Sequence, residues 1–437
     1  MIDPNDRTNG WANALAPRAP EPALEGEITV DCLVIGAGYA GLAAARRYAD
    51  LAPNARVLLV DAARVGEGAS ARNSGFVIDL PHNVGADLSD LTAQRRALRL
   101  ARAATEDLRQ LVRRHQIDCQ WSEQGQIMAA RSPAGAAALG TFRAGLDALG
   151  EAYTPMDGGA VGQRTGARGY REGVHTPGTV LIQPAALVRG LAGTLPPNVT
   201  LHEATPVTAL HPGIPVRAET PGGTIRARHV IVAVNGAVAR LGLLRGRVFQ
   251  LQLYCSMTRP LSEDEHAQMG AEAHQDADWG IVPALAFGGP TIRYTRDRRL
   301  TMRAQFTGRV SGRAAPRDYA RARALHARQI AARFPHLPPD VITDTWMGQI
   351  ALSKNFAPGF MQVSENVFTA VCQNGVGVTK GTLAGRLAAE RALSQDSDLL
   401  ADMIALGTPA ALPPRPFLDL GIKARLAQWT WSQRAET

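Results

Sequence analysis

The spacing of apolar residues near the N-terminus follows a strand, helix, strand order. Residues 29–35 form an apolar run of strand length, residues 39–51 are rich in alanine with helical spacing, and residues 56–60 form a second apolar run. Short uninterrupted apolar runs are typical of strands buried on both faces. The pattern therefore predicts two buried strands joined by a helix.

The remaining predicted elements fall into two groups. Helical spacing is found at residues 92–115, 183–195, 319–334, 383–393 and 422–431. Strand-like spacing is found at residues 200–210, 225–234, 248–257 and 367–371, with a hairpin over 291–306. Strands and helices that alternate at both ends of the chain predict a mostly parallel sheet, whereas the hairpin-rich middle predicts a second, antiparallel sheet. The predicted fold class is α/β.

Composition narrows the class of protein. The 437 residues are 45% hydrophobic and 20% charged, with no uncharged apolar run of 18 residues, so we expect a globular protein of two domains without a membrane span. Residues 1–9 carry two acids and no apolar core, which argues against a signal peptide. Four widely spaced cysteines fit reduced thiols and no metal site. We expect a cytoplasmic protein that binds no metal.

Positive charge is concentrated in arginine. The net charge is +8, only three residues are lysines, and residues 293–334 hold twelve arginines against two acids. Such a run could grip the phosphates of a nucleic acid. The alternatives are a solvated helix face with a hairpin, or a positive field that attracts an anionic substrate. We favour the solvated face and do not expect a nucleic-acid partner.

The strongest motif is a glycine-rich turn between the first strand and the helix after it. Its residues are Gly36, Ala37, Gly38, Tyr39, Ala40 and Gly41. Glycines at this spacing permit a tight turn, close approach of a pyrophosphate to the backbone, and close packing of helix on strand. Asp61 and Ala62 follow the second strand, where Asp61 can accept hydrogen bonds from ribose hydroxyls. These features predict a dinucleotide site.

Two further segments favour FAD over NAD. One follows the second strand and supplies small residues and an arginine: Gly68, Ala69, Ser70, Arg72, Asn73, Ser74 and Gly75. The other opens a C-terminal helix: Gly375, Val376, Gly377, Val378 and Thr379. The dipole of that helix could point at the flavin edge where negative charge collects on reduction. A second Gly-x-Gly-x-x-Gly is absent, so we expect the substrate itself to be the reductant.

These motifs resemble those of the D-amino-acid-oxidase-like FAD oxidoreductases, in the branch of glycine and sarcosine oxidases and gamma-glutamylputrescine oxidoreductase. The resemblance is carried by residues 34–42, 68–76 and 346–390, and Trp11 in its proline-rich leader is similar to the putrescine-type subgroup. Weaker similarity covers Val207 and Asn235, which are implied cofactor contacts. The resemblance implies a Rossmann-type FAD-binding domain with a second substrate domain built on an antiparallel sheet.

The resemblance also implies how the chain divides. The FAD-binding domain would combine residues 27–90, 160–240 and 346–400, the substrate domain residues 91–159 and 241–345, with an N-terminal extension (1–26) and a C-terminal tail (401–437). Relatives with covalent flavin use a Cys or His anchor where this chain has Ile350-Ala351 and Arg72-Asn73, which implies non-covalent FAD. Sarcosine-type relatives hold the substrate carboxylate with a lysine where this chain has Thr379, which argues against simple sarcosine recognition.

Four side chains are candidates for contact with the substrate. Lys354 and Lys380 fall in the segment expected to border the flavin, where an ammonium can poise reduced flavin for oxygen or pair with a carboxylate. His82 follows the second cofactor motif, and Tyr254 lies on an alternating strand, so either could face the substrate. For each of the four, an ordinary surface, loop or packing role is the alternative.

We therefore predict an FAD-dependent oxidoreductase acting on the CH–NH or CH–NH₂ bond of a secondary amine, an N-substituted amino acid or a gamma-glutamylated amine. The resemblance implies hydride transfer from the carbon next to nitrogen to flavin N5, giving an imine that hydrolyses. Oxygen, a quinone or another protein would accept the electrons. The alternatives are a flavin-dependent tRNA-modifying enzyme, whose arginine run would hold RNA, and a non-catalytic flavin-binding subunit. The oligomeric state stays open.

Overall fold

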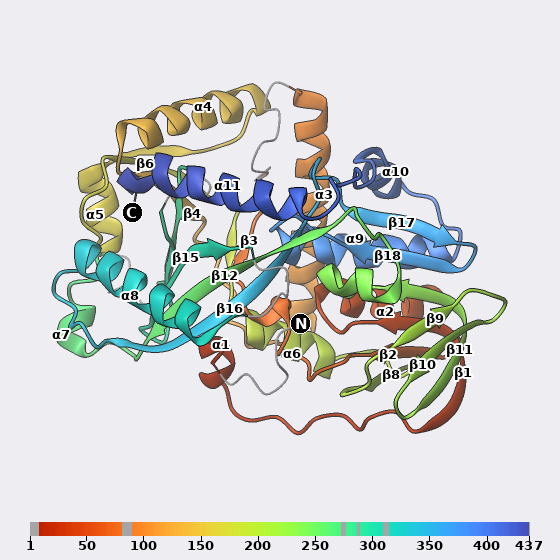
Figure 1. Ribbon diagram of the computed structural model, residues 1–437. Helices are drawn as coiled ribbons and strands as arrows, with labels where there is room; N and C mark the ends of the chain where they lie inside the picture. The colour runs from red at the N-terminus through yellow and green to blue at the C-terminus, as the bar shows by residue number, and fades with distance from the viewer. Residues whose placement is uncertain (1–7, 81–89, 272–276, 286–288, 309–313, 437) are drawn as a thin grey trace.

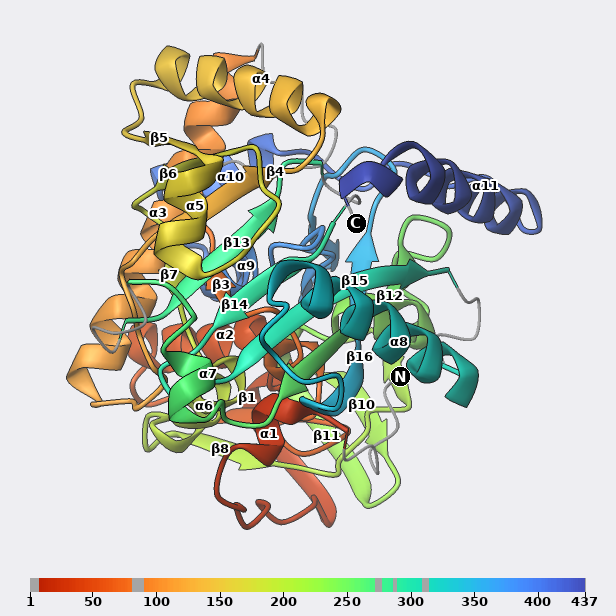
Figure 2. The ribbon, with the colours of Figure 1, turned by 90° about the vertical axis from the view of Figure 1, so that its left-hand side faces the viewer.

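The computed structural model describes residues 8–80, 90–271, 277–285, 289–308 and 314–436. Their strands form two eight-stranded sheets and one two-stranded pair, β3 (Phe76–Val77) with β7 (Val180–Leu181). The first sheet occupies the right-hand part of Figure 1 and the second sheet the left-hand part. Helices cover the outside of both sheets, as the turned view in Figure 2 also shows.

The first sheet is the predicted parallel one. Its strands lie in the order β17 (Gly359–Ser364), β18 (Val367–Val371), β11 (Gly223–Val232), β1 (Gly26–Ile35), β2 (Val57–Val60) and β8 (Val199–His202). The five strands from β18 to β8 run parallel, and β17 is antiparallel to β18. Two further strands form a side branch: β10 (Val216–Thr220) pairs antiparallel with β11, and β9 (Ala209–His211) pairs antiparallel with β10. Since β2 lies on one side of β1 and the late strand β11 on the other, the carboxyl end of β1 is a switch point, where open α/β sheets bind ligands.

Helices pack against this sheet through the alternating side chains of its strands. Helices α2 (Tyr39–Leu51) and α9 (Gly377–Ala392) make these contacts, whereas α3 (Leu91–Arg114) packs on α9 and α6 (Pro184–Gly193) contacts α2. Cys32 and Val34 belong to the core shared with α2 and α9, whereas Leu33 belongs to the core on the opposite face. Helices α2 and α9 approach closely because Gly385 has no side chain: a Cβ there would lie 1.8 Å from the carbonyl oxygen of Ala40.

The second sheet is built largely from hairpins. Its strands lie in the order β16 (Ile342–Leu352), β12 (Phe249–Thr258), β15 (Leu300–Thr307), β14 (Thr291–Tyr294), β13 (Trp279–Pro283), β4 (Gln126–Ala130), β6 (Glu172–Thr176) and β5 (Thr154–Asp157). Neighbours are antiparallel except β13 and β4. The helices of this part are α4 (Pro133–Leu149), α5 (Gly158–Thr165), α7 (Glu263–His266) and α8 (Pro316–Arg333). The predicted hairpin over residues 291–306 is confirmed as β14 and β15.

Two sequence expectations differ from this arrangement. Strands β6 and β16 pair within the second sheet, although residues 160–240 and 346–400 were expected in the FAD-binding domain. The single strand predicted at residues 200–210 is two strands, β8 and β9. The break follows from local geometry, because Ala204 has a φ of +49° and the carboxylate of Glu203 accepts a hydrogen bond from the backbone N–H of Val65.

Short elements join the two sheets and complete the chain. They are α1 (Gly10–Asn13), η1 (Ala69–Ala71), η2 (Asn235–Leu241), α10 (Asp398–Ala405), α11 (Phe417–Ser432) and η4 (Arg434–Glu436). Helix α11 crosses in front of the second sheet in Figure 1, and the turned view of Figure 2 shows it to one side of that sheet. Among the helices that the structure describes, none is long and apolar enough to cross a membrane.

Candidate active site

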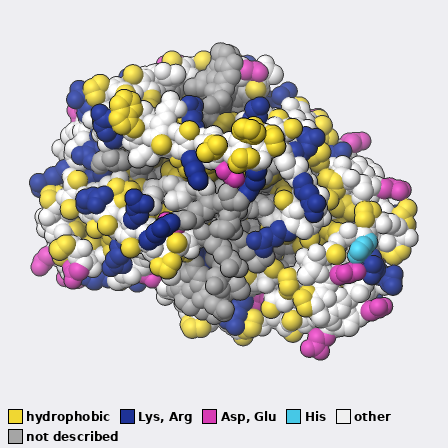
Figure 3. Space-filling model, in the orientation of Figure 1, with side chains coloured by type: hydrophobic (Ala, Val, Ile, Leu, Met, Phe, Trp, Pro, Cys, Tyr) yellow, Lys and Arg dark blue, Asp and Glu magenta, His cyan; other side chains and the backbone are white. Residues whose placement is uncertain are grey.

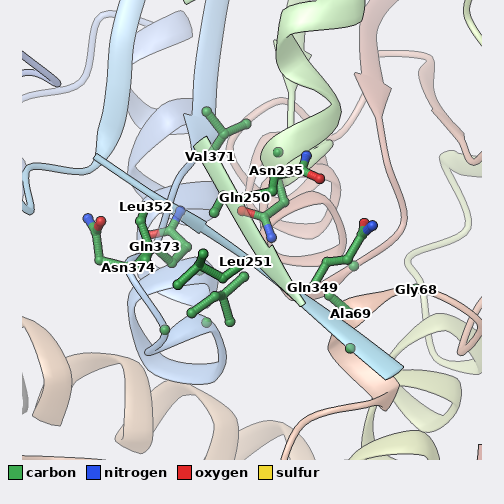
Figure 4. Close-up of a pocket in the computed structure, with 18 of the residues that line it drawn as sticks. Gly68, Ala69, Asn235, Gln250, Leu251, Gln349, Leu352, Val371, Gln373 and Asn374 are labelled. Atoms are coloured by element: carbon green, nitrogen blue, oxygen red, sulfur yellow. The ribbon is translucent and has the colours of Figure 1, made fainter. Parts of the chain in front are cut away.

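A cavity of about 800 Å³ lies where the carboxyl ends of the first sheet meet the second sheet. Figure 4 shows residues from separate parts of the chain converging on it: Gly68 and Ala69 from the second predicted motif, Gln250 and Leu251 from β12, Gln349 from β16, and Gln373 after β18. Glycine-rich backbone borders one part of the cavity and the second sheet another. The predicted motifs are thus brought together in one space.

The glycine-rich turn after β1 needs its glycines for steric reasons. Gly36 has a φ of +104°, and a Cβ there would lie 2.8 Å from the carbonyl oxygen of Ala233. A Cβ on Gly41 would lie 1.7 Å from the carbonyl oxygen of Gly36, so α2 could not start this close to β1. Of the six predicted residues, Gly41 lies behind the turn and five line the cavity: Gly36, Ala37, Gly38, Tyr39 and Ala40.

Asp61 lines the cavity at the end of β2, beside Ala62. Its Oδ2 accepts a hydrogen bond from the N–H of Ala37 at 2.7 Å, and its Oδ1 accepts one from Ala63 at 2.9 Å. Burial raises the pKa of Asp61 to about 6, and the two backbone donors oppose that shift. Each carboxylate oxygen retains a lone pair that can accept a hydroxyl group of a ligand.

The second predicted motif forms a loop that holds its own shape. Asn73 donates from Nδ2 to the carbonyl oxygen of Ser70 at 2.7 Å and accepts at Oδ1 from the N–H of Gly75 at 2.9 Å. Arg72 donates to the carbonyl oxygens of Glu67 and Met347, so its guanidinium ties the loop to β16. Gly75 lies outside the cavity lining, which contains the other predicted residues of the loop: Gly68, Ala69, Ser70, Arg72, Asn73 and Ser74.

Two buried indoles clamp this loop from outside the cavity. Trp11 of α1 donates from Nε1 to the carbonyl oxygen of Asn73 at 2.9 Å, and Trp346 of β16 donates to that of Arg72 at 3.1 Å. The indoles meet edge to face, with centroids 6.5 Å apart. Asn9 adds a third bond, from Nδ2 to the carbonyl oxygen of Ala71 at 3.0 Å. The N-terminal segment therefore positions the loop without touching the cavity.

The third motif surrounds the start of α9. Val376, Gly377 and Val378 line the cavity beside Gly375, which has a φ of +88°. No side chain caps the helix, so its first N–H groups remain available to a ligand. Thr379 is fully buried and lies outside the cavity lining.

Unsatisfied polar atoms show where a ligand would bind. Both amide atoms of Gln373 and the Oδ1 of Asn235 are buried and find no hydrogen-bond partner in the described part of the chain. Both residues line the cavity, as does the predicted contact Val207. Buried polar groups in proteins are almost always paired. Together with the glycine cradle and Asp61, they fit the polar edges of a dinucleotide that carries a flavin.

The four predicted substrate contacts have different outcomes. Lys354 is exposed and lines the cavity. Lys380 lies on α9 outside the lining, and burial lowers the pKa of its ammonium to about 8, a shift that nearby Cys372 opposes. His82 lies outside the described residues.

Tyr254 does not face the cavity, which corrects the expectation for β12. Alternate residues of a strand point to opposite faces, and it is Leu251, Leu253 and Cys255 that line the cavity. Tyr254 is fully buried on the other face, where its ring meets Tyr319 edge to face at 5.7 Å. Its hydroxyl lies 3.3 Å from that of Thr307. The tyrosine packs the second sheet against α8.

Arg303 is a cavity residue that the sequence reasoning did not single out. It lies on β15, and its guanidinium donates to the hydroxyl of Thr291 on β14, which also lines the cavity. Burial lowers the pKa of Arg303 to about 10. Within the described chain no carboxylate lies within ion-pair distance of it. The available signal was its position next to Met302 on the same strand of the predicted hairpin, because neighbouring residues of a strand point to opposite faces and Met302 lies in the core.

The C-terminal helix supplies apolar side chains to the same cavity. Those of α11 that line it are Phe417, Leu418, Ile422, Leu426 and Trp429, together with Arg425. The sequence places Ile422, Leu426 and Trp429 on one helical face, and that face is the one turned to the cavity. The guanidinium of Arg425 lies over the Trp429 ring, 5.0 Å from its centroid.

A family comparison agrees with this geometry. The model of the FAD dependent oxidoreductase family matches residues 31–391, so the chain belongs to that family and its cofactor is FAD. The match spans all three motifs that line the cavity. The protein is an FAD-dependent oxidoreductase of the class that acts on amines or amino acids.

Individual relatives cover most of the chain. It is 28% identical over 403 residues to the probable oxidoreductase OrdL of Rhizobium meliloti (strain 1021), which covers 89% of each chain. It is 27% identical over 387 residues to the gamma-glutamylputrescine oxidoreductase of Escherichia coli (strain K12), which covers 85% of each. Glycine oxidase from Geobacillus kaustophilus has the same fold, with a TM-score of 0.70 at 22% identity over 85% of this chain and 96% of that one.

Proposed function

We propose that the protein oxidises the C–N bond of an amino acid or N-substituted amino acid whose carboxylate is held by Arg303. The observation that supports this is a half-buried cation in the wall of the cofactor cavity, with a neutral hydroxyl as its hydrogen-bond partner. A charge held partly out of water without an opposite charge is costly. A substrate carboxylate would complete the pair and would fix the orientation of the molecule that carries it.

The wall around Arg303 suits a reaction at carbon. Leu251 and Leu253 of β12 and Ile350 of β16 line the same space and keep water away from a bound substrate. When bound, FAD supplies the two-electron acceptor for the carbon next to nitrogen. The substrate loses two electrons and two protons to become an imine, and water then adds to the imine carbon and releases the amine. The residues of the chain would act by holding the carboxylate and orienting the carbon.

Non-covalent binding of FAD is part of the proposal. Ile350 and Ala351, which stand where covalent relatives carry an anchor, line the cavity with side chains that cannot form such a bond. The polar atoms of Gln373 and Asn235 would instead hold the cofactor by hydrogen bonds.

The arginine run supports a small substrate over RNA. Arg293 and Arg333 within it are fully buried, and Arg303 faces the cavity, so these residues do not share one surface. Figure 3 shows arginine and lysine side chains spread among apolar ones over the face of the molecule that carries α11. A salt-dependent complex with tRNA would argue for the RNA-modifying alternative.

The test is an anaerobic absorbance titration of the FAD-loaded protein with amino acids, N-methyl amino acids, simple amines and gamma-glutamylated amines. We expect amino acids to bleach the oxidised flavin band and the corresponding amines without a carboxylate to do so far more slowly. Equal rates of flavin reduction by the amino acids and by the amines without a carboxylate would contradict the role of Arg303 in holding a carboxylate. A yellow protein that no member bleaches would overturn the proposal and favour a non-catalytic subunit.

A further inference from the structure

Helix α11 holds its place through contacts at its two ends. Before the helix, the N–H of Leu412 donates to the carbonyl oxygen of Gly246 at 2.7 Å, and Arg247 donates to that of Pro409 at 2.7 Å. After it, the carboxylate of Glu436 accepts hydrogen bonds from the backbone N–H groups of Arg131 and Ser132. No residue of α11 itself is buried. The helix therefore spans the cavity as a bridge and is not part of a core.

The inner face of this bridge is apolar and close to the second sheet. A Cβ on Gly308, just after β15, would lie 2.5 Å from Ile422 and 3.5 Å from Leu426. Arg425 is already engaged, because it donates to Gln428 at 2.9 Å and stacks on Trp429. The inner face of α11, which forms the roof over this part of the cavity, thus offers apolar contact and few polar groups.

Charged groups around the cavity are distributed unevenly. In the described lining the carboxylates are Asp61 and Glu67, and both belong to the dinucleotide motifs. The guanidinium of Arg303 lies 5.5 Å from the centroid of the Phe306 ring, and Leu251 lies beside Ile422 of α11, since a Cβ on Gly308 would be within 4 Å of both. Among the described residues of this region, a substrate with a second ammonium would find no carboxylate to pair with. An alkyl or aryl side chain would bury its surface between the second sheet and α11.

We infer that α11 is the specificity element of the active site and selects amino acids with an apolar side chain. The substrate carboxylate would bind Arg303, and the side chain would lie under Ile422, Leu426 and Trp429. The inference rests on the proposed function for the position of the carboxylate. It adds the class of substrate, namely amino acids whose side chain is alkyl or aryl and not polar or cationic.

The test uses straight-chain alkanoates from acetate to hexanoate, which carry the carboxylate and the chain but no amine to oxidise. Their binding to the FAD-loaded protein is followed by the change in the flavin spectrum. We expect the Kd to fall about fourfold per added methylene, the gain typical of a buried CH₂. In Ile422→Ser and Leu426→Ser the dependence on chain length should flatten, whereas Leu420→Ser and Trp431→Ser, on the exposed outer face of the same helix, should leave it unchanged.

The outcomes separate the two proposals. Binding without dependence on chain length, or equal effects of inner-face and outer-face variants, overturns the role of α11. If binding strengthens with chain length but no amino acid bleaches the flavin, the selectivity of the roof stands and the proposed oxidation fails. If amino acids bleach the flavin at rates that do not depend on side-chain length, only the role of α11 fails.

Discussion

Single residues in the cavity carry charge in surroundings that disfavour it. Arg303 keeps a cation in the wall of the second sheet, and Asp61 keeps a carboxylate at the end of β2. Burial lowers the pKa of the first to about 10 and raises that of the second to about 6. Groups held in such surroundings are typical of sites that become complete only when a ligand arrives.

Replacing Arg303 by methionine should separate binding from stability. We expect the Kd for a carboxylate substrate or alkanoate to rise about 30-fold or more, as for the loss of a buried charge pair. The free energy of unfolding should stay equal or rise, since a half-buried cation without a carboxylate partner is removed. Ligand titration and denaturant unfolding measure the two effects. Arg298→Met, in the exposed turn of the same hairpin, is the matched control and should change neither.

Titration of Asp61 should make FAD binding depend on pH. The pKa of about 6 belongs to the free protein, and hydroxyl groups of the ribose favour the ionised carboxylate. Below pH 6 the binding of FAD must therefore displace a proton, so the Kd should rise about tenfold between pH 7.5 and pH 5. Fluorescence titration with FAD measures it. Asp61→Asn should bind more weakly at pH 7.5 and lose this dependence; an unchanged slope in the variant would contradict the assignment.

At the scale of elements, the cofactor site depends on packing contacts between elements as well as on the residues that line the cavity. Helix α1 holds the second motif through Trp11 and Asn9, and α9 reaches its place because Gly385 lets it approach α2. Both contacts lie between elements distant in the sequence. The shape of the site is thus set by packing between helices and loops as much as by its motifs.

The indole N–H of Trp11 provides a test of the clamp. Trp11→Phe keeps the ring against Trp346 but removes the bond to the carbonyl oxygen of Asn73. We expect the Kd for FAD to rise about fivefold, the effect of one hydrogen bond of about 1 kcal/mol. Asn13→Ala, on the exposed side of the same short helix, should leave it unchanged, and an equal loss in both variants would indicate a general effect on α1.

Gly385 tests the contact of the two helices. In Gly385→Ala the new methyl group would lie 1.8 Å from the carbonyl oxygen of Ala40, so backbone must move. We expect the free energy of unfolding to fall by about 2 kcal/mol or more. Gly377→Ala, where a Cβ would meet nothing within 4 Å, is the control on the same helix and should stay close to wild type in denaturant unfolding.

Local periodicity explains which elements could be predicted. Helix α2 is found at residues 39–51 as expected, because an alanine-rich run follows directly on the glycine turn. Strand β16 gave no period-two signal, since buried and exposed residues do not alternate along it. Helix α4 was missed because glycines dilute its helical pattern, although Ser132 caps it and Gly150 ends it.

The same reasoning separates the two halves of the candidate site. The motifs at residues 36–41, 68–75 and 375–379 act through the backbone, so contiguous sequence predicts them. Arg303 was missed and Tyr254 was misplaced because the face that a strand turns to the cavity depends on pairing with distant strands. The face on which each of these side chains lies could not be decided from its own strand alone.

For the whole molecule, one buried ion pair joins the second sheet to the cofactor loop. Arg293 of β14 and Asp278 are fully buried and bonded at 2.6 Å, and Arg293 also donates to the carbonyl oxygens of Gly75 and Ile182. Gly75 ends the second cofactor motif. The two halves of the molecule are therefore locked together next to the site that they share.

Breaking this pair should weaken both folding and FAD binding. Arg293→Met leaves Asp278 buried without its partner, and we expect a loss of about 3–5 kcal/mol in unfolding free energy. The double variant Arg293→Met with Asp278→Leu removes both charges and should recover part of that loss. Chemical unfolding with and without FAD measures each step, and equal losses in single and double variants would contradict the role of the charges.

The layout of the first sheet has a consequence for synthesis on the ribosome. Strand β1 and its glycine turn emerge early, but the neighbour of β1 on one side is β11, and the third motif follows β18 near the end of the chain. The early strand–helix–strand unit must wait with an open edge until those strands arrive. Capture of FAD is therefore a late event, and a chain that stalls before residue 377 would carry a dinucleotide turn but no site in which to keep the cofactor.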